Sequence, residues 1–264
     1  MLLRKKALAI FSAFFIIIAP AALAVSPRLL GAVPEVSLPD GLPAAANSND
    51  AHHVDERCDN ERESRRRFAV QLATRGCNLA QRRKYALALA DFESAARVCP
   101  ECPRLDYARA LCLEKLRRQD EAVRAYREAI AREPEYADAQ YHLGRLLLEM
   151  EQLDAAEESF SQAIKIAPTD AQNYSARAAV WNKKHKYNRA IEDLDEAIRL
   201  DPKIAERYVA RAQLKSLLGR HEEARQDCDM AVERAPRKLG IRLYRALLSL
   251  SISNEHMVQK TEKH

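Results

Sequence analysis

Glycine is scarce in this sequence, which has 6 glycines in 264 residues. Loops that cradle phosphate groups need glycine, because the backbone must approach the phosphate closely. The sequence also contains no nucleophile elbow and no His-Glu-x-x-His motif, which mark common hydrolases and zinc proteases. We therefore expect no enzyme, no cofactor and no metal site.

An excess of charge of one sign is also missing once residues 1–24 are set aside. That segment carries three basic and no acidic side chains, so 43 − 3 = 40 Lys and Arg remain against 38 Asp and Glu. A nucleic-acid-binding protein usually has a strongly basic face. The near-neutral balance therefore predicts a partner other than nucleic acid.

Residues 1–24 have the pattern of an export signal. Arg4-Lys5-Lys6 precede an apolar run that closes with Ala22-Leu23-Ala24, a small-residue cleavage site. Cleavage predicts an exported protein of the periplasm or cell envelope, and a eukaryotic secretory route stays open. The alternative is an inner-membrane anchor at residues 7–24, the one case in which we expect membrane contact.

The rest of the chain changes composition near residue 55. Residues 25–54 hold four of the 11 prolines and end in polar turn formers, which predicts a flexible tether. From residue 55 onward Ala, Leu, Glu, Arg and Lys dominate, as in helices. We expect one helical domain over residues 55–253 and a polar tail over 254–264.

The helical part repeats with a fixed period. Prolines mark this period with a constant 34-residue spacing, at Pro100, Pro134, Pro168, Pro202 and Pro236. The alanines twelve positions before them are Ala88, Ala122, Ala156, Ala190 and Ala224. The small residues twenty-four positions before them include Gly144, and the residues eight positions before them are mostly bulky, as at Tyr126. This pattern predicts two helices per period that cross where small residues meet, with a proline ending the second helix.

A second pattern joins the two helices of three repeats. An arginine one position before the small residue is followed sixteen positions later by an aspartate; the pairs are Arg75 with Asp91, Arg177 with Asp193, and Arg211 with Asp227. This spacing separates the middle of one helix from the facing turn of its partner. We therefore predict ion pairs within each of these repeats that fix the register of its helices.

The stretch "ADAQYHLGRLLLEMEQLDAAEESFSQAIKIAP" carries Leu143-Gly144, Ala156, Phe160, Ala163 and Pro168, and it resembles a tetratricopeptide repeat. The resemblance implies an all-α, right-handed solenoid of antiparallel helix pairs. The repeats that it implies span residues 69–102, 103–136, 137–170, 171–204 and 205–238. A capping helix at residues 239–253 is expected to cover the last repeat.

In proteins similar to this one, the first helices line a concave groove that holds a peptide or a partner helix. The residues that the resemblance places in this groove are Tyr107, Leu111, Tyr141, His142, Arg145, Leu148 and Asn182. Tyrosines beside leucines and mixed charges suit a peptide held by aromatic anchors. The alternative is that Tyr107 and Tyr141 only pack against the neighbouring helix. We expect a scaffold for protein–protein interaction, with the partner and the oligomeric state left open.

Five cysteines lie in the first half of the chain, and they are Cys58, Cys77, Cys99, Cys102 and Cys112. In an exported protein they predict disulfide staples, with Cys77 bridged to Cys112 and Cys58 reaching Cys99 or Cys102. The alternatives are inert thiols and a thiol-disulfide oxidoreductase that uses Cys99 and Cys102. The last has a physical basis, because a helix N-terminus lowers a thiol pKa. Cys228 is expected to be a buried free thiol.

Overall fold

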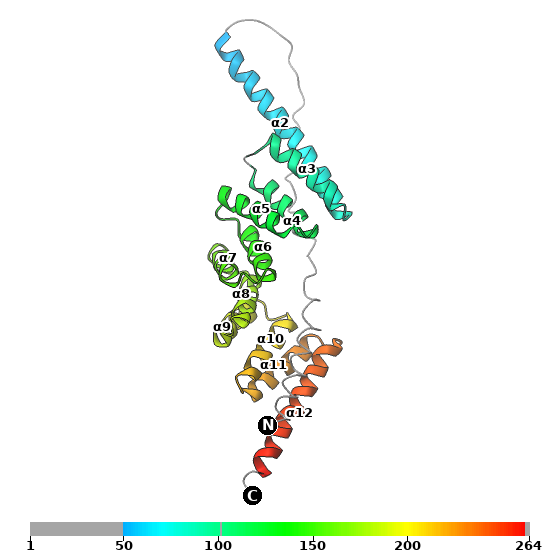
Figure 1. The fold of residues 1–264 in the computed structure, drawn as a ribbon, viewed down its shortest axis with the longest axis vertical. Helices are drawn as coiled ribbons and strands as arrows, with labels where there is room; N and C mark the ends of the chain where they lie inside the picture. Colours follow the sequence, from blue (N-terminus) through cyan, green and yellow to red (C-terminus); the bar gives the residue numbers. More distant parts are fainter. Residues whose placement is uncertain (1–49, 101, 262–264) are drawn as a thin grey trace. The chain divides into compact units, whose positions relative to one another are not determined.

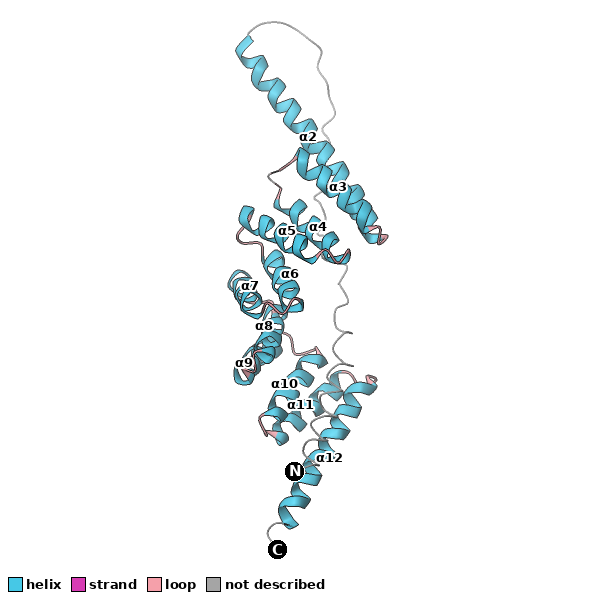
Figure 2. Cartoon of the chain, in the orientation of Figure 1, coloured by secondary structure: helices cyan, strands magenta, loops and turns pink. Residues whose placement is uncertain are grey.

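In the computed structural model, residues 50–100 and 102–261 are described, with side chains described over residues 63–100 and 102–250. The described residues form eleven helices and no strand (Figures 1 and 2). This confirms the predicted all-α class. The expected signal or anchor at residues 1–24 and the tether up to residue 49 lie outside the described residues.

The described residues divide into two compact units. We call residues 50–147 the N-terminal unit and residues 148–261 the C-terminal unit. Helices of the N-terminal unit are α2 (Asp50–Gln81), α3 (Tyr85–Val98), α4 (Pro103–Lys115), α5 (Gln119–Arg132) and most of α6 (Ala137–Glu149). Those of the C-terminal unit are α7 (Leu153–Ile166), α8 (Ala171–Lys183), α9 (Tyr187–Leu200), α10 (Ala205–Leu217), α11 (His221–Arg234) and α12 (Leu239–Thr261). Consecutive helices pack against one another from α2 to α5 in the N-terminal unit and from α7 to α12 in the C-terminal unit.

The helix starts follow from local sequence. Cys102 is the N-cap of α4, and Pro103 follows it in the first turn, where a missing backbone N–H costs nothing. Asp170 caps α8, because its side chain accepts a hydrogen bond from the backbone N–H of Gln172 at 2.9 Å. Helix α5 ends at Arg132, two positions before Pro134, so the proline stands outside the helix that it terminates.

The turns inside the helix pairs repeat a single backbone device. Arg83, Arg117, Glu151, His185 and Gly219 all have positive φ, between 56° and 75°, and they recur once per repeat period. A left-handed residue of this kind ends the first helix and directs the chain back along it. Only one of the five is glycine, so four turns hold a side chain in a conformation that costs free energy.

Small residues form the centre of each helix crossing. The five period alanines, Ala88, Ala122, Ala156, Ala190 and Ala224, are each 0% exposed. Gly76 shows how close the helices come: a Cβ built on it would lie 2.9 Å from Cε1 of Phe92 on α3. A larger residue at such a crossing would force the two helices apart.

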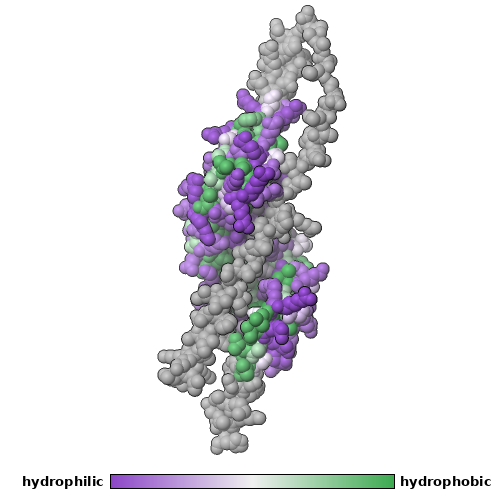
Figure 3. All heavy atoms as spheres, turned by 90° about the vertical axis from the view of Figure 1, so that its right-hand side faces the viewer, coloured by the Kyte–Doolittle hydropathy of each residue, from purple (hydrophilic) through white to green (hydrophobic). Residues whose placement is uncertain are grey.

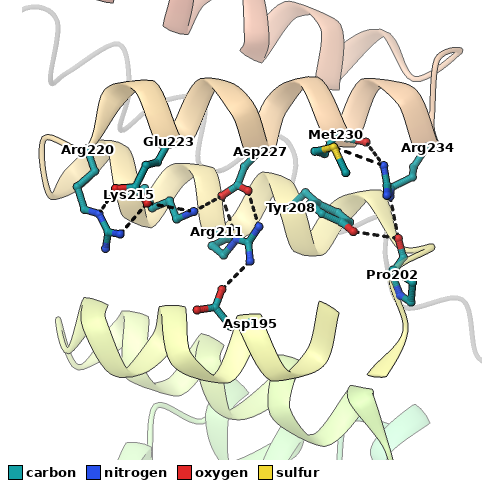
Figure 4. A network of polar contacts seen from close by, with 10 residues as sticks. All are labelled: Asp195, Pro202, Tyr208, Arg211, Lys215, Arg220, Glu223, Asp227, Met230 and Arg234. Carbon is teal, nitrogen blue, oxygen red and sulfur yellow. Dashed lines mark hydrogen bonds and ion pairs between the residues drawn. The ribbon is translucent and has the colours of Figure 1, made fainter. Parts of the chain in front are cut away.

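The predicted arginine–aspartate pairs are confirmed in all three repeats. Arg75 donates from Nε and a terminal nitrogen to Asp91, both at 2.7 Å, and Arg177 binds Asp193 in the same fork at 2.9 and 2.7 Å. Arg211 forks onto Asp227 and also reaches Asp195 on the preceding helix pair at 2.6 Å (Figure 4). Each fork fixes distance and orientation together, so it sets the register of the helices it joins.

Two helices are longer than the sequence predicted. Helix α2 begins at Asp50, so residues 50–54 are helical although they were expected in the tether. Helix α12 continues to Thr261 through most of the expected polar tail at residues 254–264. Neither extension contains a proline, so nothing in the backbone chemistry stops the helix. Among the described residues, no helix combines the length and the apolar character needed to cross a membrane.

Candidate functional site

The structure describes five of the expected groove residues within the N-terminal unit. Tyr107 and Leu111 lie on α4, and Tyr141, His142 and Arg145 lie on α6. The other two, Leu148 and Asn182, belong to the C-terminal unit, where each is half-buried. The residues of the N-terminal unit can therefore be examined as one site.

Four tyrosines and a histidine make up a ring cluster, which we call the Tyr–His cluster. Its members are Tyr107, Tyr126, Tyr136, Tyr141 and His142. The Tyr107 ring is central, with centroids 5.9 Å from Tyr126, 5.0 Å from Tyr136 and 5.7 Å from His142. His142 also meets the Tyr141 ring edge-on at 5.3 Å. Tilted and edge-on rings at these distances attract one another beyond their shared buried area.

A short chain of polar contacts runs along one side of the Tyr–His cluster. Glu114 of α4 accepts a hydrogen bond from the Tyr126 hydroxyl at 3.1 Å and pairs with Arg145 of α6 at 2.5 Å. Arg145 also lies 3.3 Å from Nδ1 of His142. A guanidinium can only donate, so Nδ1 is the acceptor and the proton of a neutral ring sits on Nε2.

Burial controls the protonation of the cluster. Burial, followed by the nearby Arg145 guanidinium, lowers the pKa of His142 to about 4. The pKa of Tyr136 is raised to about 12, mainly by burial and then by Asp138. Both side chains are therefore uncharged at neutral pH, which agrees with the acceptor role of His142 Nδ1.

The five predicted residues differ in what they offer to a partner. Tyr107 is 5% exposed and His142 is 6% exposed, so both fill the space between helices. Leu111, Tyr141 and Arg145 are partly buried and keep some exposed surface, which amounts to 14% of the side chain at Arg145. For Tyr107 the structure thus corresponds to the packing alternative, whereas Leu111, Tyr141 and Arg145 remain accessible for contact.

Tyr126 and Tyr136 were not among the expected groove residues. Tyr126 occupies the bulky position of its repeat, which the period assigns to packing, and it is 0% exposed. Tyr136 stands directly before α6, in the loop after Pro134, where a helical pattern gives no expectation. An unusual density of tyrosines over residues 107–141 was the one sequence feature that pointed to this cluster.

The cysteines are arranged differently from the predicted pairing. Sγ of Cys99 lies 2.6 Å from Sγ of Cys102, across the turn between α3 and α4. Cys77 and Cys112 are both thiols, so the structure does not contain the expected bridge between them, which stays a prediction. Burial, followed by the nearby Cys77, raises the pKa of Cys112 to about 12. The Cys58 side chain lies outside the described side chains.

Cys228 is confirmed as a buried free thiol. It is 0% exposed in the core of α10 to α12, and burial raises its pKa to about 12. Within the part of the chain that the structure describes, no group of three or more His, Cys, Asp or Glu side chains is placed to hold a metal ion.

Comparison with protein families identifies the repeats. Two family models, both described as "Tetratricopeptide repeat", match the chain, one over residues 117–180 and the other over residues 74–123 and 183–238. The chain therefore contains tetratricopeptide repeats. No curated protein matches it.

Solved structures of the same fold come from several repeat proteins. MamA residues 41 to the end from Desulfovibrio magneticus RS-1 superposes with a TM-score of 0.61 at 20% identity, covering 65% of this chain and 97% of that one. PilF of Pseudomonas aeruginosa gives 0.61 at 19% identity, covering 76% and 88%. YrrB, described as a TPR protein with an unusual peptide-binding site, gives 0.59 at 16% identity, covering 74% and 97%. At these identities the likeness establishes the fold alone.

Proposed function

We propose that this protein is a non-enzymatic scaffold that binds other proteins, and that it holds a peptide or partner helix on the first helices of its repeats. The observation that carries the proposal is that Leu111, Tyr141 and Arg145 are only partly buried and lie beside the Tyr–His cluster. Tetratricopeptide repeats in general bind proteins, and the YrrB title names a peptide-binding site for that relative of the fold.

Tyr141 and Arg145 are suited to binding a partner because both side chains are held in place. The Tyr141 ring rests edge-on against His142, and Arg145 is held by Glu114, so neither side chain has to be ordered when a partner arrives. A preorganised surface loses less conformational entropy on binding than a mobile one. Because the charge of Arg145 is already matched by Glu114, we expect apolar and aromatic contacts, rather than a net charge, to select the partner.

Site-directed photo-crosslinking tests this surface. A photoreactive phenylalanine analogue at Tyr141 should capture a partner in living cells, and the same analogue at Leu87, an exposed leucine of α3, serves as the matched control. Binding of the purified partner should then weaken about tenfold in Leu111→Glu or Tyr141→Ala. Equal capture at both positions, or unchanged affinity in both variants, would refute this surface.

The place of action is proposed separately, on the pattern of residues 1–24. We expect the protein to be exported to the periplasm or cell envelope, with an inner-membrane anchor as the alternative. Fusion of residues 1–30 to alkaline phosphatase, which is active only after export, tests this directly. A cytosolic, inactive fusion contradicts export, while an active fusion that stays in the membrane fraction favours the anchor.

A thiol-disulfide oxidoreductase is the second candidate, because Cys99 and Cys102 lie 2.6 Å apart at the N-terminus of α4. A thiolate at a helix N-terminus is stabilised by the helix dipole. The described residues contain no strand, however, and thioredoxin-like centres follow a strand. Reduction of insulin disulfides by the full chain, abolished in Cys99→Ser/Cys102→Ser, would favour this candidate over the scaffold.

A further inference from the structure

The last helix of the described chain has two apolar faces instead of one. Its inner face, made of Ile241, Tyr244 and Leu248, packs into the core formed with α10 and α11. On the other side a row of leucines is open to solvent, with exposed fractions of 64% at Leu239, 46% at Leu243, 39% at Leu247 and 62% at Leu250. Together with the exposed Ala246, we call this row the outer stripe. Figure 3 shows an apolar green patch in the lower part of the molecule, at the height where Figure 1 shows α10 to α12.

The residues of the outer stripe can be compared with those one repeat period earlier, on α10. Leu239, Leu243 and Ala246 lie one repeat period after Ala205, Val209 and Ala212 of α10. Those three α10 residues are buried in a core with α11, the second helix of their own repeat. The outer stripe therefore occupies the positions at which the first helix of a repeat packs against the second helix of that repeat.

A solvent-facing cap would differ from α12 in composition. Terminal repeats of solenoids normally carry a polar outer face, which keeps them soluble. Here the outer positions are more apolar than their counterparts inside the stack, since Leu247 and Leu250 stand where α10 has Gln213 and Ser216. The predicted role as a capping helix accounts for the packing of the inner face of α12. It does not account for the exposed leucines of the outer stripe. A run of exposed leucines on one helix is typical of an interaction site.

Charge beside the outer stripe restricts what can cover it. From Arg234 to Asn254 the sequence has five basic and no acidic residues. Arg242 is exposed and makes no ion pair with a described residue, and Arg245 pairs with Asp229 of α11 at 2.6 Å while remaining half exposed. A partner that buries the leucines must meet these guanidinium groups, so a complementary partner carries negative charge.

Inside the repeats, helices provide that negative charge. Arg211, which lies one repeat period before Arg245, pairs with Asp195 of the preceding helix pair and with Asp227 of its own second helix (Figure 4). Arg245 pairs with Asp229, which lies one repeat period after Asp195, so this ion pair corresponds to the one between Arg211 and Asp195. The residue sixteen positions after Arg245 is Thr261, at the end of α12 itself, so no carboxylate there matches Asp227.

We propose that the outer stripe of α12 binds an acidic amphipathic helix of another protein, whose apolar side chains pack on the leucines and whose carboxylates pair with Arg242 and Arg245. A helix is the occupant because the same positions of α10 already pack in a core with a helix, α11. The surface is distinct from the Tyr–His cluster, and the inference does not depend on the proposed function of that cluster.

The test uses the full chain and a pair of labelled, stapled helical peptides with one leucine face. One peptide carries glutamate on its polar face, and the other carries lysine at the same positions. Fluorescence anisotropy should show that the glutamate peptide binds at least about tenfold more tightly than the lysine peptide. Leu243→Glu/Leu247→Glu should abolish binding, whereas the matched control Leu87→Glu, another exposed leucine but on α3, should leave it unchanged.

A charge reversal makes the test specific. Arg242→Glu should reverse the preference, so that the lysine peptide becomes the tighter ligand, and circular dichroism should show unchanged helix content for every variant. Three results would each overturn the proposal: equal binding of both peptides, a dimer of the chain that Leu243→Glu dissociates, or binding to phosphatidylglycerol vesicles without binding to either peptide.

Discussion

Single arginine–aspartate forks define how the helices of a repeat face each other. The carboxylates are the buried partners: Asp91, Asp193 and Asp227 are all buried, whereas Arg75 keeps most of its side chain in solvent. When a buried carboxylate loses its arginine, the free-energy cost of removing its charge from water remains, but the ion pair that offset this cost is gone. The same holds for a half-buried guanidinium that loses its carboxylate. These pairs therefore matter more for stability than the many exposed ion pairs on the helix surfaces.

Removal of one fork should measurably destabilise the protein. We expect Asp193→Ala to lower the free energy of unfolding by about 1–3 kcal/mol, because Arg177 is left half-buried with only Ser161 as a side-chain partner. Urea denaturation followed by circular dichroism measures the change. On the same helix, Glu196→Ala breaks an exposed pair with Arg199 and should change stability by less than about 0.5 kcal/mol. Equal effects of the two substitutions would contradict this account.

Protonation of His142 should link stability to pH. Its pKa in the folded protein is about 4, below the ordinary value of 6.5, so the unfolded chain takes up the proton first as the pH falls. The contribution of His142 is therefore complete above about pH 6.5 and is lost progressively towards pH 4. NMR titration of the His142 ring should show no protonation at pH 6.

A variant isolates this histidine from the carboxylates that titrate in the same range. In His142→Gln the fall of the melting temperature between pH 6.5 and pH 4 should be shallower than in the parent protein. Parallel curves for the two proteins would show that His142 is accessible to solvent, contrary to its burial here.

At the scale of the helix pair, the left-handed turns store strain that a substitution can relieve. Arg117 has φ 62°, is exposed and makes no side-chain hydrogen bond or ion pair with a described residue. Arg117→Gly should therefore raise the free energy of unfolding by about 0.5–1 kcal/mol, since glycine adopts this conformation without a steric cost. The reciprocal change Gly219→Ala should destabilise by a similar amount. A Cβ there meets nothing within 4 Å, so only the backbone resists it. Thermal unfolding of both variants checks the opposite signs.

The junction between α3 and α4 is the place where we expect a covalent link. Oxidised glutathione should convert Cys99 and Cys102 into a disulfide, because their sulfur atoms already lie 2.6 Å apart. Peptide mapping without reductant would detect a loop-closed peptide lighter by two hydrogen atoms. Recovery of Cys77–Cys112 as the main bridge would restore the pairing that the repeat register predicted.

At the scale of the whole molecule, each helix depends chiefly on its neighbours in sequence. Deletion of residues 239–264 would remove Ile241, Tyr244 and Leu248 from the core that they form with α10 and α11. Amide hydrogen exchange should then become faster in α10 and α11 and remain unchanged in α4 and α5, as nearest-neighbour stability implies. Uniformly faster exchange over all helices would show that the chain unfolds as one cooperative unit instead.

The features that could be predicted from the sequence are those that repeat every 34 residues. The constant spacing of the prolines located the helix pairs, the buried alanines and the three arginine–aspartate forks, because each follows from a residue's place within one repeat. Burial of Tyr107 and His142 could not be predicted in this way. It depends on Tyr136 and Glu114, which belong to no repeating pattern, as well as on Tyr126 at the bulky position of its repeat.

The ends of the described chain were predicted least well for the same reason. The 34-residue period predicts the end of a helix only where a turn residue or a proline stands at the repeat spacing. No such residue continues the series after Leu250 or before Phe68. Helices α2 and α12 run on accordingly. The contact between the Cys99 and Cys102 thiols corresponds to the pair that the oxidoreductase alternative used, and not to the staple from Cys58 that the repeat register favoured.

Arg211 belongs to two consecutive repeats at once, through Asp195 on one side and Asp227 on the other. Arg245 extends the arrangement to α12 through Asp229. Exchange of residues 205–238 alone would therefore separate Arg211 from Asp195 and Arg245 from Asp229. A chimera whose exchanged segment keeps Asp195 with Arg211 and Asp229 with Arg245 leaves both guanidinium groups neutralised.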